Sequence, residues 1–162
     1  MRKFRHLFYL ILVTVLFYGC PYKSAVPISE ATTPILPALL GKWENRSSTS
    51  EYYMISKEDD FHYLIEKVST SGGDPTRYHA FISDVNGKYF LNVYEDSEFS
   101  SKDLYIHSVE VVNDNIITVR EMTDNVRETF ENSNDLKQFI ASNMNNSYFF
   151  NKDEATYLKM GK

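Results

Sequence analysis

The residue types that carry most enzyme chemistry are few in this chain, and they are scattered. Outside the N-terminal run the histidines are His62, His79 and His107, each within a different predicted strand. Three imidazoles could converge on a zinc ion, but nothing in their spacing requires it. Hydrogen-bonded strand histidines are the simpler interpretation, so we expect no metal site and no cofactor.

Acidic residues cluster at 58–60 (Glu-Asp-Asp) and at Glu95 and Asp96, with Glu98 nearby. Paired carboxylates can act as a general acid and base. These clusters, however, fall at predicted strand ends, where charge keeps sheet edges soluble. The chain also contains no Gly-x-Ser-x-Gly, His-Glu-x-x-His, P-loop or Gly-x-Gly-x-x-Gly motif. We therefore predict no catalytic residues and a protein that is not an enzyme.

The only cysteine, Cys20, directly follows an apolar run of 13 residues from Leu7 to Gly19. Basic residues and no acidic ones precede this run, which is shorter than the roughly 20 residues of a membrane-crossing helix. A basic region followed by a short apolar region is typical of a cleaved export signal, and an uncleaved signal anchor is the alternative. A single cysteine has no partner for a disulfide within the chain.

The pair Gly19-Cys20 resembles the lipobox of bacterial lipoproteins, in which a small residue precedes an invariant cysteine. The two preceding residues, Phe17 and Tyr18, are bulkier than those of the family pattern. The resemblance implies that residues 1–19 are a signal peptide and that cleavage falls between Gly19 and Cys20. It also implies that the Cys20 sulfur carries a diacylglyceryl thioether, with acyl chains such as palmitate.

The same resemblance implies a protein anchored by lipid in the cell envelope. Pro21 follows the cysteine in place of the aspartate that marks retention in the inner membrane, which favours the outer membrane, facing the periplasm. Removal of residues 1–19 leaves 14 basic and 22 acidic residues, a net charge of about −8. This charge argues against nucleic acid as a partner and against general electrostatic attraction to anionic lipid.

Residues 20–38 predict a tether between the lipidated cysteine and the folded part. Four of the five prolines fall there, without a periodic apolar pattern: Pro21, Pro27, Pro34 and Pro37. A semi-extended chain of this composition rises by about 3.1 Å per residue, or roughly 50 Å over residues 21–37. We accordingly expect one folded domain over residues 39–162.

The rest of the chain alternates short runs rich in Tyr, Phe, Ile and Val with turn residues. The Asn86-Gly87 pair is the strongest turn signal, because both residues tolerate the positive φ of a type I′ turn. It predicts a hairpin over residues 76–95. The predicted strands are 41–46, 50–57, 60–68, 76–85, 88–95, 104–113 and 115–122, and runs at 147–150 and 155–160 predict a closing hairpin or a strand plus a tail.

One α-helix is predicted, over residues 133–143, with Ser133 or Asn132 as its N-cap and Asp135 in its first turn. Its apolar residues repeat at helical spacing and require a surface to cover. The predicted sheet is the surface available to this stripe, which consists of Leu136, Phe139, Ile140 and Met144.

Gly41-Lys42-Trp43 at the entrance to the first strand resembles the Gly-x-Trp signature of lipocalins. The order of Cys20, a short linker and this Gly-x-Trp motif resembles the arrangement in uncharacterised small lipoproteins of Gram-negative bacteria with a lipocalin-like domain. The resemblance implies a mainly β fold: an antiparallel lipocalin-like barrel, or an open half-barrel, of about 7–9 strands with one late helix packed on it. No late arginine is available to cover Trp43, and Lys159 or Lys162 would be a poor substitute, so the open form remains an alternative.

The functional expectation is a membrane-anchored, non-enzymatic binding module. Tyrosine and phenylalanine are abundant, and tyrosine-lined sites suit a lipid or another small amphipathic ligand, although strand propensity favours the same residues. Protein interaction in the envelope, in assembly or as an inhibitor, is the alternative. A hydrolase is the least favoured reading, since it would require the histidines or carboxylates to converge.

Overall fold

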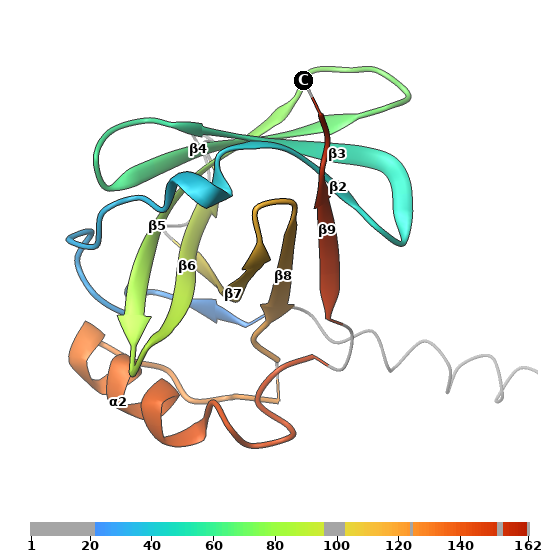
Figure 1. Cartoon of the computed structure of the whole chain (residues 1–162). Coiled ribbons are helices and arrows are strands. Elements are labelled where there is room, and N and C mark those ends of the chain that lie inside the picture. The colour runs from blue at the N-terminus through green and yellow to red at the C-terminus, as the bar shows by residue number, and fades with distance from the viewer. Residues whose placement is uncertain (1–21, 96–102, 124, 152–153, 162) are drawn as a thin grey trace, which may run out of the picture.

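Eight antiparallel strands, β2 to β9, close into a barrel (Figure 1). The computed structural model describes residues 22–95, 103–123, 125–151 and 154–161. Each strand from β2 to β8 pairs with the next, and β9 closes the barrel by pairing with both β8 and β2. The predicted antiparallel barrel is confirmed, in its closed form.

The strands are β2 (Gly41–Asn45), β3 (Ser48–Lys57), β4 (His62–Ser69), β5 (Thr76–Val85), β6 (Lys88–Glu95), β7 (Leu104–Asn113), β8 (Ile116–Glu121) and β9 (Ala155–Lys159). Their bounds lie within two residues of the predicted ones. The β5–β6 hairpin is confirmed, with φ of 53° at Asn86 and 81° at Gly87. Among the described residues the second alternative, a strand plus a tail, holds in place of the closing hairpin: Phe150 makes an isolated bridge with Met122, and β9 is followed by a short tail.

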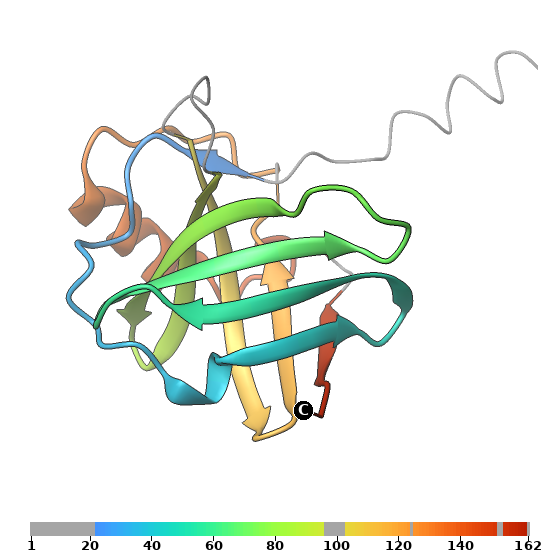
Figure 2. The ribbon, with the colours of Figure 1, turned by 90° about the horizontal axis from the view of Figure 1, so that it is seen from above.

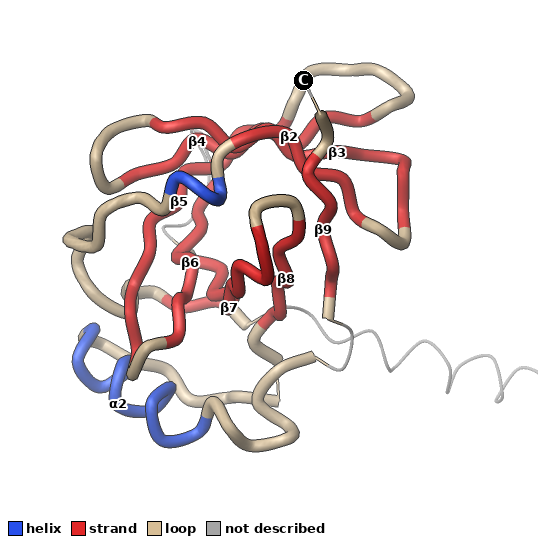
Figure 3. The backbone as a smooth tube through the Cα atoms, viewed as in Figure 1, coloured by secondary structure: helices blue, strands red, loops and turns tan. Residues whose placement is uncertain are grey.

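The helix α2 (Ser133–Asn143) begins and ends where the sequence predicts, and Asn132 is its N-cap. The Asn132 side chain accepts a hydrogen bond of 3.0 Å from the backbone N–H of Asp135. Leu136 and Ile140 are fully buried. Figure 3 shows α2 at the bottom of the view and the short 3-10 helix η2 (Pro37–Leu39) above it.

Two separate hydrophobic cores result from the alternation of side chains along the strands. Inward residues such as Trp43, Tyr63 and Ile82 form the first core, inside the barrel. Outward residues of β5, β6 and β7 form the second core with α2 and with the N-terminal segment. The barrel wall between β5 and β7 is thus buried on both faces.

The prediction of a tether over residues 20–38 is wrong for the part that the structure describes. Tyr22, Ser24 and Ile28 are 7%, 2% and 1% exposed. A short strand, β1 (Lys23–Ser24), pairs with the first residues of β7. The folded domain therefore includes the segment from Tyr22 onward and does not start near Leu39. Proline excludes regular helix and central strand, but it does not prevent an irregular segment from packing on a surface.

Asn92, on the outer face of β6, holds this segment in place. Its side-chain oxygen accepts a hydrogen bond of 2.8 Å from the backbone N–H of Ile28. Its side-chain nitrogen donates to the carbonyl of Phe81 and to the hydroxyl of Ser83. The amide is completely buried, so the irregular backbone at Ile28 is satisfied inside the outer core.

Replacing Asn92 with alanine is expected to lower the free energy of unfolding by about 1–3 kcal/mol, because the backbone N–H of Ile28 then remains buried without a partner. Denaturant unfolding would measure the loss, and limited proteolysis would show cleavage within residues 22–38. The exposed Asn115 provides a matched control, Asn115→Ala. Equal stability of the two variants would contradict the role assigned to Asn92.

Candidate functional site

The barrel has two different ends, since consecutive antiparallel strands place their connections alternately at one and the other. The end that carries η2 and the turns 58–61, 86–87 and 114–115 is called the closed end here. The opposite end, with the turns 46–47 and 70–75 and the long connection from β8 to β9, is called the open end. In Figure 2 the β7–β8 turn lies at the bottom of the view and β1 lies near the top.

Trp43 and Lys159 seal the closed end. The indole N–H of Trp43 donates a hydrogen bond of 2.8 Å to the carbonyl of Leu39, in η2. Lys159 lies with its Nζ 5.1 Å from the centre of the Trp43 ring and also contacts the carbonyl of Ala38. Lys159, which the sequence analysis expects to be a poor substitute for arginine, thus provides the cation over the ring, and its long apolar stem allows this position.

Gly41 is required at this end for two reasons. Its φ of +130° is a conformation that side chains with a Cβ rarely adopt. A Cβ at this position would also lie 2.8 Å from Cε of Lys159. The Gly-x-Trp pattern therefore has a structural role, which is to let Lys159 cross Gly41 and cover Trp43.

Tyrosines line the barrel interior towards the open end. The strand register places Tyr53 opposite Trp43, Tyr78 opposite Ile65 and Tyr157 opposite Ile117, so all three rings face inward. Their neighbours deeper in the barrel are buried, whereas the three tyrosines keep part of their surface accessible. The interior thus passes from an apolar, filled layer to an accessible layer of phenols.

An ion pair between Lys67 and Glu51 lies beside these tyrosine side chains. The Nζ of Lys67 lies 2.8 Å from Oε2 of Glu51, and the hydroxyl of Tyr53 donates a hydrogen bond of 2.9 Å to Oε1 of the same carboxylate. The hydrogen bond from Lys67 lowers the pKa of Glu51, and the same bond raises the pKa of Lys67. Both groups are therefore charged at neutral pH and largely neutralise one another.

Burial raises the pKa of Tyr53, Tyr78 and Tyr157, and nearby carboxylates, Glu121 beside Tyr157 and Glu95 beside Tyr78, add to the rise. These phenols consequently remain protonated and can donate hydrogen bonds. The rings of Tyr53 and Tyr157 meet edge to face, with their centres 5.6 Å apart. The accessible layer therefore offers rigid apolar rings and neutral polar tips.

His107 has the most unusual environment in this layer. Its cross-strand neighbours are Leu91 on β6 and Glu121 on β8. The Nδ1 atom is buried and has no hydrogen-bond partner. Burial lowers the pKa of His107, and the negative charge of Glu121 acts in the opposite direction. A buried nitrogen without a hydrogen-bond partner costs about 1–3 kcal/mol, so His107 lowers the stability of the fold at this position.

The three histidines do not converge. His62 and His79 lie on the outer face near the closed end, where each contacts an acidic residue at 2.8 Å, Asp59 and Glu58 respectively. His107 faces the interior. The described residues contain no group of three or more His, Cys, Asp or Glu side chains that could hold a metal ion. A zinc site built from these histidines is therefore not formed.

Other candidate residues from the sequence lie in different places. Glu95 stands at the end of β6, on the rim of the open end, whereas Asp96 and Glu98 lie outside the described residues. Gly19 and Cys20 also lie outside them. Within the described ranges, no helix is long and apolar enough to cross a membrane.

A polar hollow of about 430 Å³ lies on the outer wall, beside the end of α2. Its lining includes two cationic side chains. Lys88 donates to the side-chain oxygen of Asn145 at 2.9 Å, and Arg120 lies 3.3 Å from Glu154. Both cations already have partners, and both are exposed to solvent.

Sequence reasoning missed Glu51, Lys67 and Glu121 as members of the site. Alternation along β3 and β4 could have placed Glu51 with Tyr53 and Lys67 with Ile65 on the inward face. The approach of Tyr157 and Glu121 depends on how the barrel closes, which no local pattern encodes.

No family model, curated protein or solved structure matches this chain. The fold and the site together define a closed antiparallel barrel with a sealed end and an accessible, tyrosine-lined end.

The environment of His107 predicts a specific dependence of stability on pH. Unfolded, this histidine has a pKa near 6.5, and its folded pKa is lower. Below about pH 6.5 the unfolded chain therefore binds a proton that the folded chain does not, and the free energy of unfolding falls as the pH falls. Between pH 7.5 and 5, the decrease in the free energy of unfolding that His107 causes is expected to disappear in His107→Gln. Denaturant unfolding at several pH values, with His62→Gln as the control, would measure it, and an unchanged slope in His107→Gln would contradict the assignment.

Proposed function

We propose that this protein is a lipoprotein of the bacterial envelope whose barrel binds a small amphipathic ligand at the open end, without catalysing a reaction. The observation that carries the proposal is the buried, unpartnered Nδ1 of His107 inside an accessible layer of tyrosines. A polar group of a ligand would give this atom its missing hydrogen bond. The sealed, apolar interior beneath it would limit how deeply the ligand can enter.

The chemistry of the open end restricts the ligand class. On one side of His107 lies the apolar Leu91 and on the other the carboxylate of Glu121. Glu51 is neutralised by Lys67, and Glu121 adds a negative charge at the edge of the layer. An apolar body with an uncharged or cationic polar group is therefore favoured over an anionic ligand.

The proposed membrane anchor is the acyl group on Cys20, followed by Pro21 as the first residue of the mature chain. Its support is the short apolar run over residues 7–19 and the resemblance of Gly19-Cys20 to a lipobox. The outer membrane, with the barrel in the periplasm, is the proposed location.

Ligand binding can be tested by native mass spectrometry of the full chain extracted from envelope membranes. A bound small molecule is expected on the natural protein, with much lower occupancy in His107→Gln and in Tyr157→Phe. The variant His62→Gln, altered on the outer face, should retain it. Absence of any bound mass in the natural protein, or equal occupancy in all four, would overturn the binding proposal.

Lipidation can be tested by growing cells with a clickable fatty acid and comparing the natural chain with Cys20→Ala. The label should attach to the natural chain and be lost in the variant, because the thioether forms on the Cys20 sulfur. Equal labelling of the two proteins would refute the anchor.

Interaction with an envelope protein is the second candidate, and a line of exposed apolar side chains favours it. Met54, Leu158, Met160 and Val112 are 38%, 38%, 41% and 52% exposed. Leu158 pairs with Glu44 and Met54 pairs with Lys42 on β2, so these side chains cross one outer wall of the barrel. Crosslinking in intact cells that is lost in Met54→Ser with Leu158→Ser would support this function over ligand binding.

A further inference from the structure

We infer that the open end of the barrel faces the membrane surface, so that its ligand is a lipid taken directly from that bilayer. The inference rests on the proposed function, because it requires both that the N-terminal region holds the chain at a membrane and that the open end binds a ligand. It adds an orientation and a ligand source that the anchor alone does not specify.

The first step is that the start of the folded chain is fixed at the open end. Lys23 and Ser24 pair with Tyr105 and Leu104, the first residues of β7. The backbone N–H of Tyr22 donates a hydrogen bond of 3.1 Å to the carbonyl of Met122, just past the end of β8. Both contacts lie where strands reach the open end.

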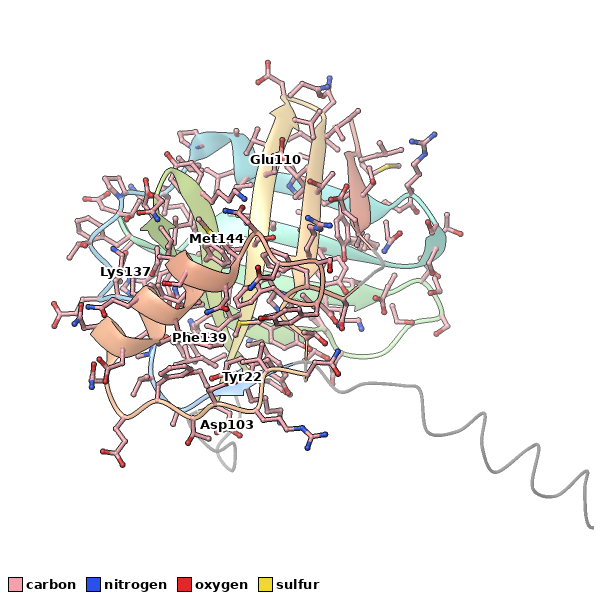
Figure 4. All side chains as sticks on the ribbon, turned by 90° about the horizontal axis from the view of Figure 1, so that it is seen from below. Tyr22, Asp103, Glu110, Lys137, Phe139 and Met144 are labelled. Carbon is pink, nitrogen blue, oxygen red and sulfur yellow. The ribbon has the colours of Figure 1, made fainter. Side chains whose placement is uncertain are left out.

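The Tyr22 side chain reinforces this attachment. Its hydroxyl donates a hydrogen bond of 3.1 Å to the carbonyl of Glu128, and the residue is 7% exposed within the outer core. Figure 4 shows Tyr22 close to Asp103, at one end of β7, with Glu110 towards the other end. Moving Tyr22 away would expose a large aromatic ring and remove β1 from the barrel.

The second step is the short distance from Tyr22 to the anchor. Consecutive Cα atoms are 3.8 Å apart, so Cys20 lies within about 8 Å of Tyr22 and Gly19 within about 11 Å. The conclusion is the same whether the anchor is an acyl chain on Cys20 or the uncleaved run that ends at Gly19. Either one enters the bilayer beside the open end.

The third step is the length of the barrel. From Tyr105 to Asn113, β7 rises by about 3.3 Å per residue, or about 26 Å in total, and this places the closed end far from the anchor. The chain between Cys20 and Tyr22 is too short to turn the barrel over. A long tether would have allowed any orientation, but the packing of residues 22–28 removes that freedom.

The orientation places the accessible layer with Tyr53, Tyr157 and His107 opposite the lipid surface. A lipid can then move part of its length from the bilayer into the open end without crossing water. A neutral or zwitterionic lipid fits this layer better than an anionic one, given the carboxylate of Glu121 opposite His107.

The test uses the full chain reconstituted in phosphatidylcholine vesicles that contain a nickel-chelating lipid. Nickel ions at the bilayer surface quench a nearby dye, so the quenching at the two ends of the barrel shows which end lies closer to the membrane. With Cys20 acylated, a single thiol-reactive dye is placed through Ser71→Cys at the open end or through Asp114→Cys at the closed end. Both positions are exposed turn residues. Quenching is expected to be several-fold stronger at position 71.

A flexible Gly-Ser insertion between Pro21 and Tyr22 is the control, and it should largely remove the difference. Equal quenching at the two positions without the insertion, or stronger quenching at position 114, would overturn the orientation while the anchor stands. If neither variant floats with the vesicles, the membrane anchor fails and the orientation fails with it.

Discussion

The pairing of β9 with both β2 and β8 is the constraint on which the rest of the structure depends. Five residues, Ala155–Lys159, satisfy two strand edges at once and so convert a curved sheet into a barrel. The same strand brings Lys159 over Trp43 at the closed end and Tyr157 against Tyr53 towards the open end. Closure, the seal and the accessible layer therefore arise together, and an open sheet would have none of the three.

The outer core leaves the barrel interior free for a site. Small barrels must cover their outer walls as well as fill their interiors, and here α2 and the N-terminal segment cover β5, β6 and β7. Asn92 fixes the segment by satisfying the backbone at Ile28. Because stability comes from both faces of the wall, the open half of the interior can retain tyrosines, an ion pair and the unpartnered His107.

The sequence predicts what local patterns encode. Period-two alternation and turn residues locate the strands and the β5–β6 hairpin, and the Asn132 cap with its apolar stripe locates α2. The packing of Tyr22 and Ile28 could not be predicted, because prolines restrict the local backbone conformation but do not indicate whether a segment is buried. Part of the site escapes prediction for a related reason: Tyr157 is far from Glu51 and Lys67 in the chain and comes near them only through the closure of the barrel by β9.

The most direct test of the account is the ¹⁵N NMR spectrum of the His107 imidazole, recorded on the full chain before and after its lipids are removed by extraction. The account predicts that the Nδ1 resonance shifts on extraction and returns when a zwitterionic lipid is added back, while the resonances of His62 and His79 stay in place. An Nδ1 resonance that is identical in all three samples would contradict the claim that a ligand completes the open end of the barrel.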